Sequence, residues 1–113
     1  MFAAAAAALV AACGGAPRPE AQMASSEGAI RGASEAGAQN VPRATLYVRL
    51  AQEERQHAIE LVKNGENGRA RFVLARSEAD AELAIALARQ ARAEQAADAA
   101  GQRVQDLQQK VSP

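Results

Sequence analysis

The chain has 113 residues, in which 13 Lys and Arg balance 13 Asp and Glu, and this length accommodates a single domain. Its apolar fraction of 49% is mostly alanine, with no Trp, one Tyr and two Phe, so the expected core is thin. The balanced charge and the scarcity of aromatic residues argue against nucleic-acid binding, which needs a basic face and stacking side chains.

A short apolar run opens the chain and ends in Val10-Ala11-Ala12-Cys13. It is too short to span a bilayer and is typical of a secretory signal. These four residues resemble the lipobox of bacterial lipoproteins, although no Lys or Arg precedes the run. The resemblance implies cleavage before Cys13 and acylation of its sulfur. We therefore expect residues 1–12 to be a lipoprotein signal peptide and Cys13 to be lipidated.

The tether expected after Cys13 covers residues 13–21 and contains Pro17 and Pro19, with no core-forming residue. A first helix is predicted at about residues 22–36. Its face would carry Met23, Ile30 and Ala33.

A second helix is predicted at residues 42–63. Pro42 suits its first position, and Gly65 suits the left-handed conformation that follows a helix end. Apolar side chains form one stripe along it: Tyr47, Leu50, Ala51, Ala58, Leu61 and Val62. We expect Asn67 to be the N-cap of the next helix after a tight turn, so the two helices form an antiparallel hairpin.

The third helix is predicted at residues 67–110 and would be about 65 Å long. Its apolar residues follow steps of three and four at Phe72, Ala79, Leu83, Ala86, Ala93, Ala97, Ala100, Val104, Leu107 and Val111. Arg76 and Gln90 are the two polar interruptions, and the alternation from Ala93 to Val111 is a heptad-like seam. The second helix can cover only the first half of this stripe. The part after Gln90 is then left without an intramolecular partner. It is either a coiled-coil docking surface or a solvated, fraying helix, and its candidate interaction seam is Ala93, Ala97, Ala100, Val104 and Leu107.

These elements define the expected fold class as all-α. An antiparallel helical hairpin carries a shorter N-terminal helix, and the long C-terminal helix overhangs this three-helix arrangement.

Several segments of residues 25–93 are similar to the family called domain of unknown function four-three-nine-eight, which comprises short lipoproteins of Gram-negative bacteria. The segments that carry the resemblance are Ala29-Ile30, Glu35-Ala36-Gly37-Ala38, Val41-Pro42, Leu50-Ala51-Gln52-Glu53, Asn64-Gly65, Arg69-Ala70 and Ala79-Asp80-Ala81-Glu82-Leu83-Ala84. The resemblance implies a lipid-anchored envelope protein and no particular reaction. In such lipoproteins an aspartate directly after the lipidated Cys would favour retention in the inner membrane. This chain has Gly14 at that position, so we expect the protein in the outer membrane, facing the periplasm.

The segment Glu54-Arg55-Gln56-His57 has the Glu-x-x-His spacing that occurs in di-iron helix bundles. The chain has one His and no second such motif, and Glu54 would lie level with Glu78 near neutralising arginines. A solvated or ion-paired face is the favoured interpretation. We expect no catalytic residue, no metal and no cofactor.

Two functions from different classes remain. The first is a non-enzymatic structural or protein-interaction module of the envelope, with a homo-oligomer or an envelope protein bound through the C-terminal helix. The second is a single tetratricopeptide-like hairpin that binds a peptide, although a lone repeat buries its face poorly. A link to the cell wall through a terminal lysine is disfavoured because Lys110 is followed by Val111-Ser112-Pro113.

Overall fold

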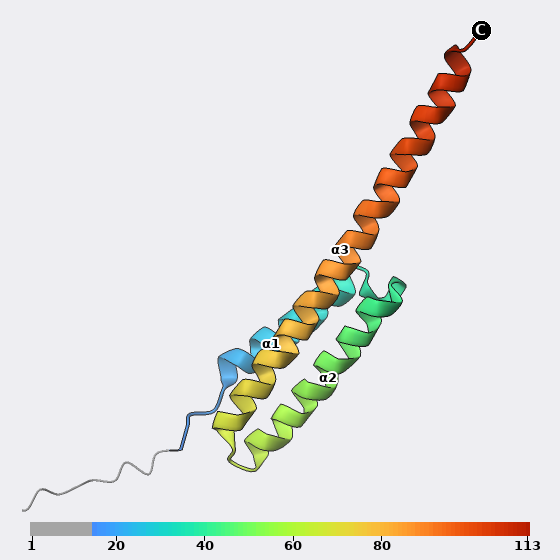
Figure 1. The fold of residues 1–113 in the computed structure, drawn as a ribbon. Helices are drawn as coiled ribbons and strands as arrows, with labels where there is room; N and C mark the ends of the chain where they lie inside the picture. Colours follow the sequence, from blue (N-terminus) through green and yellow to red (C-terminus); the bar gives the residue numbers. More distant parts are fainter. Residues whose placement is uncertain (1–14) are drawn as a thin grey trace, which may run out of the picture.

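The computed structural model describes residues 15–113. Over this range the chain is all-helical, as expected, with three α-helices, one short 3-10 turn and no strand (Figure 1). The elements are α1 (Glu20–Glu35), the turn η1 (Ala38–Asn40), α2 (Pro42–Lys63) and α3 (Asn67–Val111). The lipidation site predicted at Cys13 lies outside the described residues.

Glycine and proline set the ends of the first two helices. Gly37 and Gly65 have φ values of 90° and 78°, in the left-handed region that glycine adopts without steric cost. After α2, the amide of Gly65 donates to Val62 O and that of Glu66 to Leu61 O, at 3.0 and 2.8 Å. This pair of bonds is a Schellman motif, which satisfies carbonyls at the helix end and reverses the chain.

The predicted N-cap of α3 is wrong. Glu66 occupies the N-cap and makes no side-chain capping bond, while Asn67 is already helical. The Asn67 side chain is used elsewhere, because its Nδ2 donates to Ala16 O at 2.9 Å. This bond ties the segment before α1 to the start of α3.

The core consists mainly of alanine. Most of it forms two clusters along α3, one of Ala33, Ala38, Ala44, Ala84 and Ala88, the other of Ala58, Leu61, Ala70 and Leu74. Ala51 and Ala81 are also fully buried. Small side chains at the contacts allow helix axes to approach closely. Leu74 is the largest side chain that is fully buried.

The register of α3 also differs from the prediction in its first half. The buried residues of α3 are Ala70, Leu74, Ser77, Ala81, Ala84 and Ala88, whereas Phe72, Ala79, Leu83 and Ala86 are exposed. Both sets repeat every three or four residues, and Arg76 occupies the position between Phe72 and Ala79 in the second set. The bundle selects the set with the smaller side chains, since alanine and serine permit the close approach of α1 and α2. On α2, the predicted stripe does face the core, with Ala51, Ala58 and Leu61 buried.

The last part of α3 extends past both other helices (Figure 1). Every residue from 92 to 113 is exposed. At the root of this projecting part, Arg92 Nη2 donates to Ala36 O at 3.0 Å, which fixes α3 to the end of α1.

Candidate interaction surface

Two apolar stripes run along α3 on opposite sides. The first, here called the buried stripe, consists of the buried residues of α3, among them Leu74. The second, here called the outer stripe, includes Phe72. Two residues of an α-helix turn through about 200°, so a stripe displaced by two positions faces the opposite direction. The outer stripe comprises Phe72, Ala79, Leu83, Ala86, Ala93, Ala97, Ala100, Val104, Leu107 and Val111. It therefore faces away from α1 and α2.

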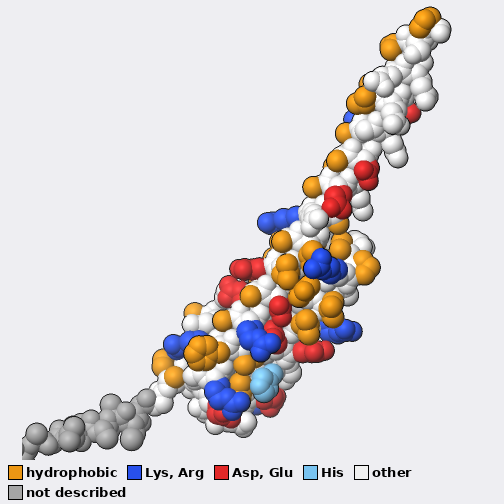
Figure 2. Space-filling view, in the orientation of Figure 1, with side chains coloured by type: hydrophobic (Ala, Val, Ile, Leu, Met, Phe, Trp, Pro, Cys, Tyr) orange, Lys and Arg blue, Asp and Glu red, His pale blue; other side chains and the backbone are white. Residues whose placement is uncertain are grey.

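The exposed large hydrophobic residues concentrate on this outer stripe. Of six such residues in the described part of the chain, five belong to it, and Leu46 on α2 is the sixth. The exposed fractions of the five are 77% for Phe72, 39% for Leu83, 53% for Val104, 55% for Leu107 and 81% for Val111. Figure 2 shows hydrophobic side chains spaced along one edge of the projecting part of α3. A single exposed apolar residue needs no explanation, but an aligned row is typical of an interaction surface.

The buried stripe changes character where α3 leaves the bundle. After Ala88 and Ala91 its positions are occupied by Gln95, Asp98, Gln102, Gln105 and Gln109. The outer stripe remains apolar to Val111. The projecting part of α3 is therefore amphipathic, and its apolar side is the continuation of the outer stripe. All five predicted seam residues, Ala93, Ala97, Ala100, Val104 and Leu107, lie on this side and are exposed.

Two polar residues interrupt the outer stripe. Gln90 occupies a stripe position, and its Nε2 donates to Glu94 Oε1 at 3.0 Å. Arg76 occupies another position nearer the start of α3. Its guanidinium Nη2 pairs with Glu54 Oε1 at 3.0 Å.

The Glu-x-x-His segment forms an ion-pair cluster. Glu54 lies against Arg76 and Asp80, and its side chain is 16% exposed. Burial, and then the negative charge of Asp80, raise the pKa of Glu54, while Arg76 opposes this rise. Glu78 accepts a hydrogen bond from Ser25 Oγ on α1 at 2.5 Å. His57 is exposed. Residues 15–113 contain no group of three His, Cys, Asp or Glu that could hold a metal ion.

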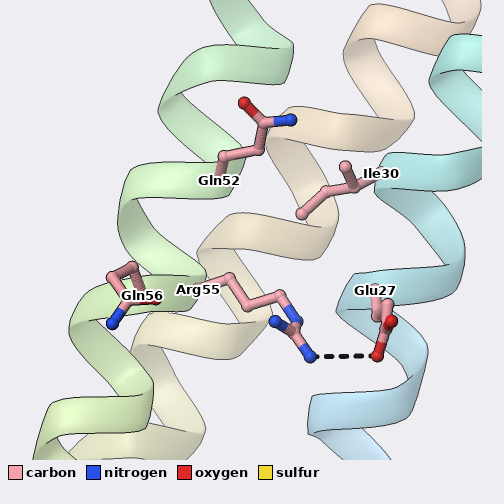
Figure 3. Close-up of a pocket in the computed structure, with 5 residues that line it drawn as sticks. All are labelled: Glu27, Ile30, Gln52, Arg55 and Gln56. Carbon is pink, nitrogen blue, oxygen red and sulfur yellow. Dashed lines mark hydrogen bonds and ion pairs between the residues drawn. The ribbon is translucent and has the colours of Figure 1, made fainter.

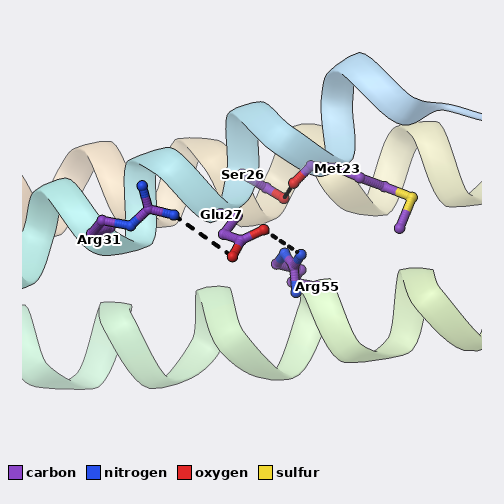
Figure 4. Close-up of polar contacts among 5 residues, drawn as sticks. All are labelled: Met23, Ser26, Glu27, Arg31 and Arg55. Carbon is purple, nitrogen blue, oxygen red and sulfur yellow. Dashed lines mark hydrogen bonds and ion pairs between the residues drawn. The ribbon is translucent and has the colours of Figure 1, made fainter.

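A pocket of about 260 Å³ lies between α1 and α2 (Figure 3). It is lined by Glu27, Ile30, Gln52, Arg55 and Gln56. Arg55 Nη2 pairs with Glu27 Oε2 at 3.0 Å, and Arg31 Nη2 lies 3.6 Å from Glu27 Oε1 (Figure 4). The acid is thus shared by two cations and ties α1 to α2. None of the lining residues is a serine, threonine or cysteine that could act as a nucleophile.

Two serines are buried, and the sequence analysis did not predict their burial. Ser77 Oγ donates to Ala51 O at 2.7 Å, across the contact of α3 with α2. Ser26 Oγ donates to Met23 O at 3.1 Å within α1 (Figure 4). Ser77 lies three residues after Leu74 and four before Ala81, so its spacing alone indicates that it shares their buried face. Serine is small enough for a close helix contact when its hydroxyl finds a carbonyl.

Comparisons with family models, curated proteins and solved structures gave no match. The resemblance to the lipoprotein family stays a prediction. Among the described helices, none combines the length and the hydropathy needed to cross a membrane.

Proposed function

We propose that this chain is a non-enzymatic, lipid-anchored protein of the Gram-negative cell envelope that binds a protein partner through the outer stripe of α3. The observation that carries the proposal is the alignment of five of the six exposed large hydrophobic residues on one stripe of one helix. Burial of this stripe by a partner would remove apolar surface from water, which is the main driving force of most protein association.

The geometry at the two ends of α3 supports a membrane-proximal bundle and a membrane-distal contact. Ala16, close to Cys13 in sequence, is bonded to Asn67 at the start of α3. The C-terminal end of α3 lies at the far end of the molecule (Figure 1). A lipid on Cys13 would hold the bundle near the bilayer, and the projecting helix would reach away from it. The finer arrangement proposed is thus an antiparallel hairpin with an overhanging, partner-binding helix.

Lipid attachment is tested by the intact mass of the membrane-extracted protein. The proposal predicts a mass that matches cleavage before Cys13 plus acyl chains, and predicts that Cys13→Ala removes both the added mass and the membrane association. A wild-type protein without acyl chains that stays in the soluble fraction would contradict the anchor.

Partner binding is tested by photo-crosslinking in cells. A photoreactive amino acid is placed at Val104 on the outer stripe, with a matched variant at Gln102, which lies two residues away on the polar side of the same helix. The proposal predicts discrete adducts from position 104 and a far lower yield from 102. Equal yields, or none from 104, would contradict a role for the outer stripe.

The pocket between α1 and α2 is the feature that favours the alternative, a hairpin that binds a peptide. In that case Arg55→Ala would abolish partner capture and Leu107→Lys would leave it unchanged. The proposed function predicts the reverse pattern.

A further inference from the structure

We infer that the partner of the outer stripe is a second copy of this chain, and that the two α3 helices form a parallel, in-register, two-stranded coiled coil over residues 83–111. This inference rests on the proposed function, because it names the partner of the same surface.

The spacing of the outer stripe is that of a coiled-coil seam. From Leu83 to Val111 the positions alternate strictly in steps of three and four, over four heptads. In heptad notation the a positions are Leu83, Gln90, Ala97, Val104 and Val111, and the d positions are Ala86, Ala93, Ala100 and Leu107. Such a pattern sustained over three to four heptads, with charges beside it, indicates a coiled coil.

The side chains at the C-terminal end favour two strands. Val104 and Val111 are β-branched residues at a, and Leu107 lies at d between them. Valine at a with leucine at d favours a dimer over larger assemblies. Gln90 is the one polar residue at a in this range. In a parallel, in-register pair it meets its own copy, and a polar pair at a fixes the register.

The flanking charges distinguish the two helix directions. The residues before each a position (g) include Arg89, Arg103 and Lys110, and the residues after each d position (e) include Glu94. None of these four side chains makes an ion pair within the described part of the chain.

In a parallel dimer each g residue meets the e residue five positions later on the other helix. Arg89 then faces Glu94 of the second copy, twice by symmetry, and no like charges meet.

An antiparallel dimer pairs g with g and e with e. In the register that would match Leu83 with Leu107 of the second copy, Arg89 faces Arg103 of that copy, and Glu94 faces Glu94. The attraction of Glu82 for Lys110 only partly offsets these contacts. Charge complementarity therefore selects the parallel arrangement, which also places both chain entries at the same end, as two lipid anchors in one membrane require.

The outer stripe is accessible for this contact inside the bundle as well as beyond it. Leu83 and Ala86 are exposed on the side of α3 opposite to the buried Ala81 and Ala84. The two bundles would therefore lie on the outside of the pair. Arg76, engaged by Glu54, marks the end of the contact on the bundle side.

Direction and register are tested by disulfide trapping. The full-length chain carries Cys13→Ser, which removes its single native cysteine, together with Leu107→Cys, and the matched control carries Gln105→Cys on the polar side. The inference predicts a disulfide-linked dimer for position 107 and little for 105. In a mixture of Leu83→Cys and Leu107→Cys chains, a dominant 83–107 disulfide would overturn the parallel arrangement.

Charge complementarity is tested by sedimentation equilibrium, with circular dichroism as the check that each variant folds. Arg89→Glu is expected to raise the dimer Kd roughly tenfold, because two attractive pairs become repulsive. Adding Glu94→Arg is expected to restore the wild-type Kd. An antiparallel pair would instead bind more tightly with Arg89→Glu, since Arg103 would gain an opposite charge.

Failure of this inference is distinguishable from failure of the proposed function. A chain that is monomeric at millimolar concentration, but crosslinks in cells from Val104 to a different protein, overturns self-association and leaves the interaction role standing. A monomeric chain without position-specific adducts overturns both.

Discussion

Leu74 and Phe72 lie two residues apart on α3, and the first is buried whereas the second is exposed. Leu74 is completely buried against Ala58, Leu61 and Ala70, whereas Phe72 is 77% exposed. Leu74→Ala removes the equivalent of three methylene groups, worth about 2.4 kcal/mol of transfer free energy, and leaves part of the volume empty. We expect the free energy of unfolding to fall by about 3 kcal/mol, a large share of the roughly 5–15 kcal/mol of a typical domain.

Phe72→Ala is the matched control. It removes a larger side chain, but one that is mostly in water, so we expect a change within about 0.5 kcal/mol. Urea denaturation followed by circular dichroism at low protein concentration measures both variants. A Phe72→Ala loss equal to or larger than that of Leu74→Ala would refute the register of α3 in the bundle, and with it the outward direction of the outer stripe.

Three further predictions follow from buried or constrained groups. Ser77→Ala loses the bond to Ala51 O and should lower the free energy of unfolding by about 1 kcal/mol, measured by the same denaturation. Gly65→Ala forces a side chain into φ 78° and should cost about 1–2 kcal/mol, while the exposed Gly101, whose added Cβ would meet open space, should gain stability on the same substitution. The third concerns Glu54, whose pKa is raised in the folded state by burial and by Asp80, so the folded chain binds more protons than the unfolded chain just above pH 4.5. The contribution of Glu54 to stability therefore rises as the pH falls through the folded pKa, and Glu54→Gln should flatten this pH dependence without lowering stability at pH 7. A Gln variant that is clearly less stable at pH 7 would contradict this balance and show that the pair with Arg76 dominates.

Both ends of α2 could be predicted from the sequence because they depend on individual residues with special backbone geometry. Pro42 begins α2, and Gly65 ends it in the left-handed conformation that the turn requires. These signals depend on a residue and its immediate neighbours. The helical periodicity and the absence of strand patterns likewise depend on short windows of sequence.

The register of α3 depended on what the helix packs against, and the sequence offered two equally spaced stripes. The stripe with Phe72 and Leu83 has the larger apolar area, which made it the expected core. The structure buries Ala81 and Ala84 instead, and their small side chains allow the axes of three helices to approach closely. Such a choice is a property of the assembled bundle and is absent from any single window.

The sequence predicts arginines near Glu54, and Arg76 does pair with it, but the other polar contacts between helices depend on the assembled bundle. Glu54 on α2 lies against Arg76 and Asp80 on α3, and Asn67 bonds to Ala16, 51 residues away in sequence. Each pairing follows from the exact rotation and offset of the helices. The exposure of the residues from Ala93 to Leu107 was predictable, since they lie beyond the bundle and their exposure depends only on the difference in helix length.

The most direct test of the account is a photo-crosslinking scan in cells at every position from 93 to 111. We expect adduct yields that peak at Ala93, Ala97, Ala100, Val104, Leu107 and Val111 and fall at Gln95, Asp98, Gln102 and Gln105. A yield without this three-and-four period, or one that peaks on the polar side, would contradict the outer stripe as the interaction surface of this protein.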